Sequence, residues 1–419
     1  MARIVITTVG TTGDVIPYLA LARALVARGH DALLVSHAMH EQLVRSKDVE
    51  FFAESDFCTV ERFNAVLDEV RVTKEPLKQF ELLLNKLFLR RAEPRFNRHV
   101  EASKGADFVV SNGFDFLGQE GAIRNDVPWA SVTLMPHLIP TDEAPVYPLP
   151  NLGDWWIRGT WKTLYALAQD INRRTRLVLE PLGAPRRSLG VAGAIADRLH
   201  LVGASPHIGH ERGDWPPQVT MTGAWLDAAP DYTPDAELAA FLEANPRPVV
   251  VTFGSMGGSE AEATSAIVME ALARIKRPAI VQSGYSGLAA EGDAILSVGY
   301  VPHHFLFAQA GCIVHHCGAG TSTAACRAGV PSVPVPHLFD QYYWAGMLHE
   351  RGVAPKPIFR KDLTARRLAR RIEDALKPKY VEAARALGPQ VEAEDGTNRA
   401  VDAIEAALGQ RGVSPDASH

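Results

Sequence analysis

Short apolar runs alternate with helical segments along this chain, and the alternation starts twice. In the first half, residues 3–9 have the pattern of a buried strand, and residues 17–28 carry apolar side chains at helical spacing. In the second half, an apolar run at 248–253 precedes a glycine turn and a helical pattern over 260–275. Because strands that alternate with helices form parallel, doubly wound sheets, the sequence predicts an α/β fold with one such sheet in each half.

Each half has a glycine-bracketed turn directly after its first strand. The first turn is Gly-Thr-Thr-Gly at residues 10–13, and the second is Gly-Ser-Met-Gly at residues 254–257. Ligands of open parallel sheets bind outside the carboxyl ends of the strands. We therefore expect both turns to face a binding site.

A third turn is the most specific one. Residues 312–315 form an apolar strand, and a helix is expected to begin near Thr321. The helix start directs unpaired backbone N–H groups and a positive partial charge at one spot, which suits a phosphate. Gly318 and Gly320 let a ligand approach the backbone closely, and His316 adds a side-chain donor.

Two polar residues, Asp340 and Gln341, follow the next strand along the chain. A carboxylate and an amide are suited to hydrogen bonds with hydroxyl groups. Together with the phosphate turn, they describe a site for a diphosphate that carries a polyol, as a nucleotide-sugar does.

Composition excludes several classes of function. The formal net charge of −5 argues against general nucleic-acid binding. The four cysteines lack paired ligand spacing, no Asp-x-Asp pair lies near the phosphate turn, and we expect neither a metal nor a bound cofactor. The chain enters its first strand at once and has no apolar run of membrane-spanning length, so a cytoplasmic protein is expected.

Residues 299–307, 313–322 and 337–341 together resemble the donor signature of the UDP-glycosyltransferase family, in the bacterial branch that includes glycopeptide, sterol and rhamnolipid glycosyltransferases. The resemblance implies the GT-B fold, in which two Rossmann-like domains face each other across a cleft. It also implies inverting, metal-independent transfer of a hexose from a UDP- or dTDP-sugar.

The resemblance assigns nucleoside and sugar contacts. Tyr300 occupies the place of an aromatic residue that stacks on the base, and the Val301 backbone would pair with the base edge. The alternative for Tyr300 is an ordinary core aromatic. Asp340 and Gln341 would bind the sugar hydroxyls. Many plant relatives have a ribose-binding glutamate where this chain has Ala324.

The resemblance also assigns the residues that would contact the diphosphate. His316, the Gly320 and Thr321 amides and the Thr321 hydroxyl would hold it, and Ser255 would add a contact. His315 precedes His316 in an alternating strand, so its side chain should face the other way and be structural.

Residues 10–17 resemble the Gly-Ser-Arg-Gly-Asp type of loop in the bacterial branch, which makes Asp14 the candidate general base. The alternative is that Asp14 is the N-cap of a helix opened by Pro17. Asn112 stands roughly where histidine-based relatives orient their base with an aspartate. Asp115 is a nearby alternative base.

The acceptor pocket should lie in the first half, where large apolar side chains gather. Candidate contacts are Phe114, Met135, His137 and Tyr147, the last two in a proline-rich loop at 136–150, and an apolar helix is expected over 80–89. Such a lining suits a lipophilic or aromatic acceptor. A lipid acceptor would bring peripheral membrane contact.

The predicted boundaries divide the chain into five parts. They are an acceptor-binding domain (1–205), a proline-rich linker (206–232), a nucleotide-sugar domain (233–388), a helix packing back on the first domain by resemblance (389–409), and a tail (410–419).

The sequence therefore predicts a glycosyltransferase that acts on a hydroxyl of a lipophilic small molecule, natural product or lipid. Two alternatives stay open. One is a nucleotide-sugar 2-epimerase of the same fold, and the other is a non-catalytic partner protein that binds nucleotide-sugars.

Overall fold

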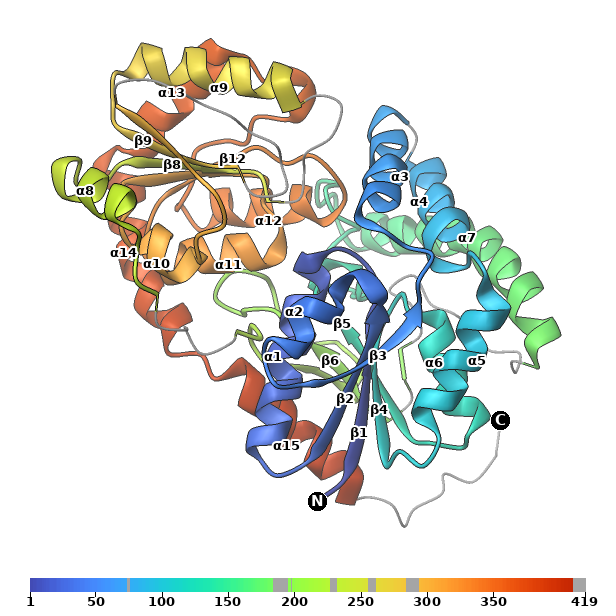
Figure 1. The fold of residues 1–419 in the computed structure, drawn as a ribbon. Helices are drawn as coiled ribbons and strands as arrows, with labels where there is room; N and C mark the ends of the chain where they lie inside the picture. Colours follow the sequence, from blue (N-terminus) through green and yellow to red (C-terminus); the bar gives the residue numbers. More distant parts are fainter. Residues whose placement is uncertain are drawn as a thin grey trace.

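The computed structural model has two α/β domains that lie against each other (Figure 1), which confirms the predicted fold class. The structure describes residues 1–73, 76–183, 195–196, 198–226, 232–254, 261–283 and 294–409. Ser255 and the predicted tail lie outside the described residues.

The first domain is built on a seven-stranded sheet in the order β3-β2-β1-β4-β5-β6-β7, with all neighbouring strands parallel. Strands β2 and β3 lie on one side of β1 and the remaining strands on the other, so the crevice where ligands bind opens beyond the ends of β1 and β4. The strands are β1 (Arg3–Thr7), β2 (Asp31–His37), β3 (Glu50–Ser55), β4 (Phe108–Asn112), β5 (Trp129–Thr133), β6 (His200–Val202) and β7 (Val219–Met221).

Helices pack around this sheet, and some of them lie near the carboxyl ends of its strands (Figure 1). They are α1 (Thr12–Ala27), α2 (Glu41–Arg45), α3 (Val60–Val72), α4 (Pro76–Leu83), α5 (Ala92–Ser103), α6 (Phe116–Arg124) and α7 (Asp154–Leu179), with single turns at η1 (Ala38–His40), η3 (Pro136–Leu138) and η4 (Glu180–Leu182).

Two helices differ from their predicted form. The helix predicted over 17–28 begins earlier, at Thr12, and contains Pro17. The helix predicted over 80–89 is not continuous, because α4 passes into a π-helical turn, η2 (Leu84–Phe88), in which the Leu89 amide donates to the Leu84 carbonyl at 2.8 Å. A π turn is wider than an α turn and is frequent at functional sites.

The second domain has a five-stranded parallel sheet in the order β10-β9-β8-β11-β12. Its strands are β8 (Val249–Thr252), β9 (Ala279–Gln282), β10 (Ile295–Val298), β11 (Cys312–His315) and β12 (Ser332–Pro334). Its helices are α8 (Ala236–Ala244), α9 (Ala261–Ile275), α10 (His303–Ala308), α11 (Ala319–Arg327), α12 (Asp340–Glu350), α13 (Ala365–Ala375) and α14 (Pro378–Glu392), with a single turn at η6 (Arg360–Asp362).

The predicted linker at 206–232 contains a strand of the first domain. Val219–Met221 forms β7, which pairs with β6 and completes the first sheet. The first domain therefore extends beyond the predicted boundary at 205. Pro216 and Pro217, within the predicted linker, come shortly before this edge strand.

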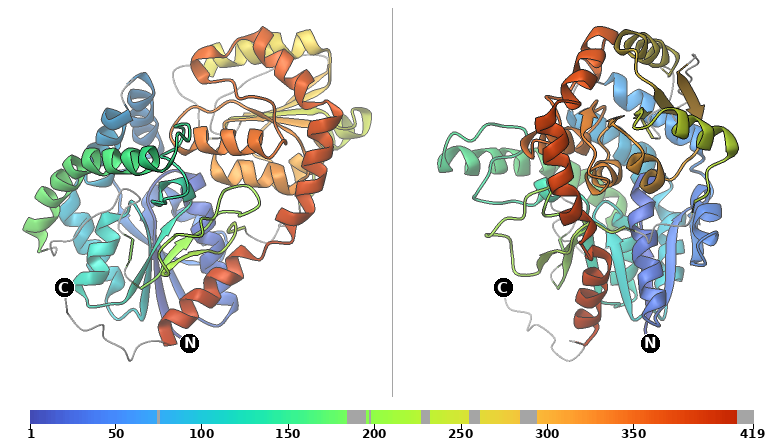
Figure 2. Two further views of the ribbon diagram at one scale, coloured as in Figure 1. Left: turned by 180° about the vertical axis from the view of Figure 1, so that it is seen from behind. Right: turned by 90° about the vertical axis from the view of Figure 1, so that its left-hand side faces the viewer.

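The segment predicted as one helix over 389–409 is two helices. Helix α14 ends at Glu392, and α15 (Gly396–Gly409) then runs across the first domain (Figure 2). Apolar residues of α15 join the core formed by α1 and the first sheet. At its outer side, Arg28 of α1 contacts Glu405 at 3.1 Å.

Helix α12 makes an apolar contact between the domains. Its Tyr343 and Trp344 belong to one buried cluster with Ile139, Val202 and Met221 of the first domain. This contact holds the two sheets in place on either side of the space between them.

All four cysteines are buried free thiols, in agreement with their interpretation as small hydrophobic residues. In the part of the chain that the structure describes, no helix has the length and apolar character needed to cross a bilayer.

Candidate active site

A cavity of about 1590 Å³ lies between the domains, where Asn112, Thr252 and Gln282 end their strands. Most of the predicted site residues are brought together here. Those that line the cavity are Asp14, Phe114, Met135, His137, Tyr147, Tyr300, His316, Gly318, Gly320, Thr321, Asp340 and Gln341. Val301 is buried beside Tyr300, and Ser255 is outside the described residues.

The predicted phosphate turn is an open helix end. Cys317 has a left-handed backbone (φ 66°), Gly318 is the N-cap, and α11 begins at Ala319 rather than near Thr321. Residues 319–321 line the cavity, and their amides have no partner within their own helix and no capping side chain from Gly318. This arrangement can hold an anion.

His316 lies within the same turn and is a neutral donor. A methyl group on Gly254 would come within 2.9 Å of its Cε1, and one on Gly318 within 2.7 Å of its Nε2, so both glycines are needed beside the ring. Burial lowers the pKa of His316 to about 3. A hydrogen bond to a phosphate oxygen would therefore come from an uncharged imidazole.

His315 faces the other way, as predicted. Its Nδ1 accepts from the Cys317 amide at 3.2 Å and its Nε2 meets the Ser332 hydroxyl at 3.0 Å. The ring is fully buried and holds the turn in shape.

Asp340 and Gln341 lie next to each other but make different contacts. The Gln341 side-chain oxygen accepts from the amides of His337 and Leu338 at 2.8 and 3.0 Å, so it shapes the loop. Asp340 begins α12 and faces the cavity. Burial, and then the negative charge of Asp14, raise the pKa of Asp340 to about 7. Asp14 and Asp340 thus face the same cavity from opposite domains.

Asp14 is the third residue of α1 and not its N-cap. The N-cap is Thr11, whose amide and hydroxyl donate to Asp14 Oδ2 at 2.7 and 2.9 Å. The alternative interpretation, in which Asp14 is the N-cap of a helix that begins at Pro17, is therefore wrong, because the helix begins before Asp14. Burial raises the pKa of Asp14, while the Thr11 contacts oppose that rise. The carboxylate is held by one oxygen at the cavity wall.

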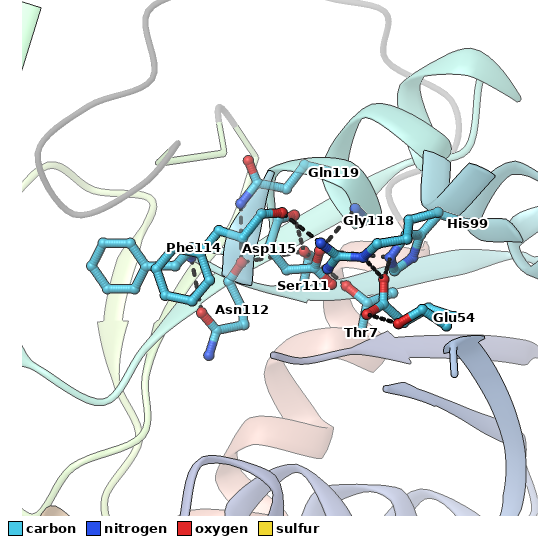
Figure 3. A network of polar contacts seen from close by, with 12 residues as sticks. Thr7, Glu54, His99, Ser111, Asn112, Phe114, Asp115, Gly118 and Gln119 are labelled. Atoms are coloured by element: carbon cyan, nitrogen blue, oxygen red, sulfur yellow. Dashed lines mark hydrogen bonds and ion pairs between the residues drawn. The ribbon is translucent and has the colours of Figure 1, made fainter. Parts of the chain in front are cut away.

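Asp115 does not reach the cavity. It caps α6 by accepting from the Gly118 amide at 3.1 Å, and it lies 3.7 Å from His99 in the interior (Figure 3). Asn112 uses its side-chain oxygen to accept from the Phe114 amide at 2.9 Å. Asp115 is therefore excluded as the base, whereas His137, predicted as an acceptor contact, lines the cavity.

Tyr300 is 74% exposed at the cavity, so its interpretation as a core aromatic is wrong. The carbonyl of the next residue, Val301, accepts from the Gln282 side chain at 2.7 Å. Gln282 was not predicted as a site residue. Its place at the end of β9 was the signal that could have identified it.

The first-domain half of the cavity is an aromatic wall formed by Phe80, Phe88 and Phe114. Phe88 and Phe114 are stacked, with ring centroids 6.1 Å apart and planes 14° apart, and Phe80 lies 5.8 Å from Phe114. Tyr147 lies at the seam between domains, where its hydroxyl donates to the Tyr342 carbonyl of α12 at 2.9 Å. His137 stacks on Tyr343 of the same helix at 4.2 Å.

Leu338 is a second residue that sequence reasoning missed. It comes from the second domain but is buried among Phe57, Leu83 and Leu87 of the first. Its amide bonds to Gln341, so the loop at 337–341 contacts the helices behind the aromatic wall directly.

Solved structures with the same arrangement are glycosyltransferases. The glycosyltransferase of kitacinnamycin matches with a TM-score of 0.73 at 20% identity, over 97% of this chain and 99% of that one. The glycosyltransferase VinC, solved in complex with dTDP, matches with a TM-score of 0.67 at 21% identity, over 98% of this chain and 100% of that one. The two parallel-sheet domains around one cavity thus define the GT-B fold.

Sequence comparisons give the family. Residues 4–86 match the glycosyltransferase family 28 N-terminal domain, and residues 266–406 match the erythromycin biosynthesis protein CIII-like C-terminal domain. The chain is 30% identical over 429 residues to O-mycaminosyltylonolide 6-deoxyallosyltransferase of Streptomyces fradiae, covering 96% of this chain and 97% of that protein. It belongs to the UDP-glycosyltransferase family.

Sterol glucosyltransferases also resemble this chain. Sterol 3-beta-glucosyltransferase UGT80A2 of Arabidopsis thaliana is 30% identical over 422 residues, which is 96% of this chain. The chain spans 65% of the length of that relative.

The burial of Asp340, together with the negative charge of Asp14, predicts a pH-dependent gain in stability for Asp340→Asn. Because the pKa of Asp340 rises to about 7 on folding, its contribution to stability is largest below about pH 4 and is lost as the pH rises to 7. Thermal unfolding should show a Tm gain of about 2–4 °C at pH 8 and little gain at pH 4.5. The exposed Glu382→Gln variant is the control. An equal gain at both pH values would contradict the raised pKa of Asp340.

Proposed function

We propose that this protein is an inverting, metal-independent glycosyltransferase that moves a hexose from a UDP- or dTDP-sugar to a hydroxyl of a lipophilic acceptor. One observation carries the proposal: the open end of α11 beside His316 and the carboxylate of Asp14 lie on opposite domains around one cavity. One side can hold a leaving diphosphate, and the other can accept a proton.

On the second domain, the amides of residues 319–321, the Thr321 hydroxyl and the His316 imidazole would bind the diphosphate. These donors would stabilise the negative charge that grows on the leaving group during transfer, so that no metal is required. The exposed ring of Tyr300 would stack on the base, and the Val301 backbone would meet the base edge. Asp340 would bind sugar hydroxyls.

On the first domain, Asp14 would take the proton from the acceptor hydroxyl as the oxygen attacks the anomeric carbon. The bond to the new oxygen forms while the bond to the diphosphate breaks, so the anomeric configuration inverts in one displacement. The Thr11 contacts leave the second carboxylate oxygen of Asp14 without a hydrogen bond from the described residues. That oxygen is available to the acceptor.

The apolar wall supports a lipophilic acceptor. Phe80, Phe88 and Phe114, with Met135, give the first-domain half of the cavity a continuous apolar lining. The names of the sterol and tylonolide glycosyltransferases describe hydrophobic acceptors too. The donor nucleotide is proposed as UDP or dTDP, because the structure of VinC holds dTDP.

The same wall disfavours the epimerase alternative. A 2-epimerase acts on the nucleotide-sugar alone and has no use for a large apolar half-site. A non-catalytic binding partner would not need a carboxylate at Asp14, which its partial burial makes costly to keep ionised.

The function test is product formation from defined substrates. The protein, supplied with UDP-glucose or dTDP-glucose and either cholesterol or a macrolide aglycone, should yield a glycoside detectable by mass spectrometry, in EDTA as well as without it. The product anomer, read by proton NMR, should be opposite to that of the donor. A 2-epimerised donor, a retained anomer, or activity that requires added Mg²⁺ or Mn²⁺ would each overturn the corresponding part of the proposal.

Asp14→Asn should lower transfer by about 10²- to 10⁴-fold, because an amide cannot accept the proton. The amide oxygen can still accept from Thr11, so folding should survive. The measurements are kcat for glycoside formation, dTDP affinity and a thermal unfolding curve. Asp154→Asn, which changes an exposed acid in the first turn of α7, is the matched control. A stable variant with near-normal transfer would move the role to His137.

His316→Ala should weaken dTDP or UDP binding by about 10- to 100-fold, the effect of losing a hydrogen bond to a charged group. Because His316 is neutral at pH 7, the loss should be similar across pH 6 to 9 in calorimetric titrations. His207→Ala, outside the cavity, is the control. Unchanged nucleotide affinity would remove His316 from the donor site.

A further inference from the structure

A buried polar cluster lies behind the aromatic wall. It consists of Glu54, His37, Arg95, His99 and Asp115, and we call it the Glu54 cluster. Glu54, His99 and Asp115 of this cluster are shown in Figure 3. Glu54, on β3, contacts Arg95 Nε at 2.6 Å, His99 Nε2 at 3.2 Å and His37 Nδ1 at 2.5 Å. None of the five lines the cavity.

Glu54 is the charged centre of this cluster. Burial alone would raise the pKa of its carboxyl, but the Arg95 charge and the hydrogen bonds from His37 and His99 hold that pKa well below the usual range. The carboxylate is therefore ionised and fixes Arg95. Removing either partner would leave a buried charge unpaired.

Arg95 reaches from this cluster to the π turn of the cavity wall. Its Nη1 donates to the carbonyls of Leu87 and Phe88 at 2.8 Å each and of Arg90 at 3.2 Å. The last carbonyls of a helical turn have no partner within the turn and need external donors. Arg95 supplies that donor, so η2 is tied to Glu54 through one guanidinium.

The segment that carries Phe114, the other ring of the stack, also contacts the Glu54 cluster. Phe114 lies between Asn112, which binds its amide, and Asp115, which caps α6 and lies near His99. Phe88 ends η2 and lines the cavity opposite it. Both stacked rings thus sit on segments anchored to the Glu54 cluster.

We infer that Arg95 is a positioning residue for the acceptor: by gathering the η2 carbonyls onto Glu54, it fixes Phe88 against Phe114 and sets which acceptors the apolar half-site admits. The inference rests on the proposed function. It assigns acceptor selectivity to a side chain that does not touch the acceptor.

Replacing Arg95 with lysine tests the anchoring of η2 separately from the positive charge beside Glu54. Arg95 uses Nε for Glu54 and Nη1 for the carbonyls, whereas lysine has one nitrogen and cannot span both. Arg95→Lys therefore keeps a cation beside Glu54 but releases η2. The control is Arg98→Lys on the same helix, where the guanidinium donates to the Ala53 carbonyl and lies over Phe52, away from the cavity.

The first measurement is hydrogen exchange by mass spectrometry. In Arg95→Lys the peptide covering residues 84–91 should exchange faster, while the α11 peptide and the Arg98→Lys protein should match the wild type. This readout needs neither donor nor acceptor. Unchanged exchange at 84–91 would overturn the anchor even if the protein proved to have another activity.

The second measurement is acceptor selectivity. KM for a rigid polycyclic acceptor such as cholesterol should rise by about tenfold in Arg95→Lys, while KM for a small phenol and for the donor should stay within about twofold. Phe88→Leu, which keeps the anchor, should reproduce the selectivity change without the exchange change, and it serves if Arg95→Lys does not fold. An unchanged acceptor preference in both variants would overturn the inference. Absence of any transfer by the wild type would instead count against the proposed function.

Discussion

Apolar packing of α12 against the first domain fixes the geometry in which the cavity can work. Tyr343 and Trp344 are buried at this seam with Ile139 and Val202. The same helix begins at Asp340, so the position of that carboxylate in the cavity depends on how α12 seats against the other domain. The closeness of two acidic groups from separate domains is thus a product of interdomain packing and not of either loop alone.

The two halves of the cavity rely on different physics. The second-domain half offers a helix end and a neutral imidazole, which favour an anion without placing a full positive charge beside it. The first-domain half offers stacked rings, which favour apolar area. A ligand pair that satisfies both halves is charged at one end and lipophilic at the other.

Features set by local sequence could be predicted, and features set by distant partners could not. The strand before His316 and the turn after it follow from neighbouring residues, so their roles in the fold were predictable. Asp115 caps α6 locally, but its place beside His99 could not be predicted, and neither could the contacts by which Arg95 joins the η2 carbonyls to Glu54, a residue far from it in sequence. The bonds of the Gln341 side-chain oxygen to its own loop could not be predicted from residue type. Strand β7 was hidden because it is only three residues long.

The chain passes between the domains twice, once between β7 and α8 and again between α14 and α15. A single tether would let the domains swivel freely, whereas two tethers restrict relative motion to rotation about the line that joins them. Because the chain returns to the first domain in α15, the second domain is in effect inserted into the first. A chimera that takes its second domain from a relative must therefore be spliced at two points. The 14 residues of α15 have to come from the same protein as α1, because the two helices pack in one core.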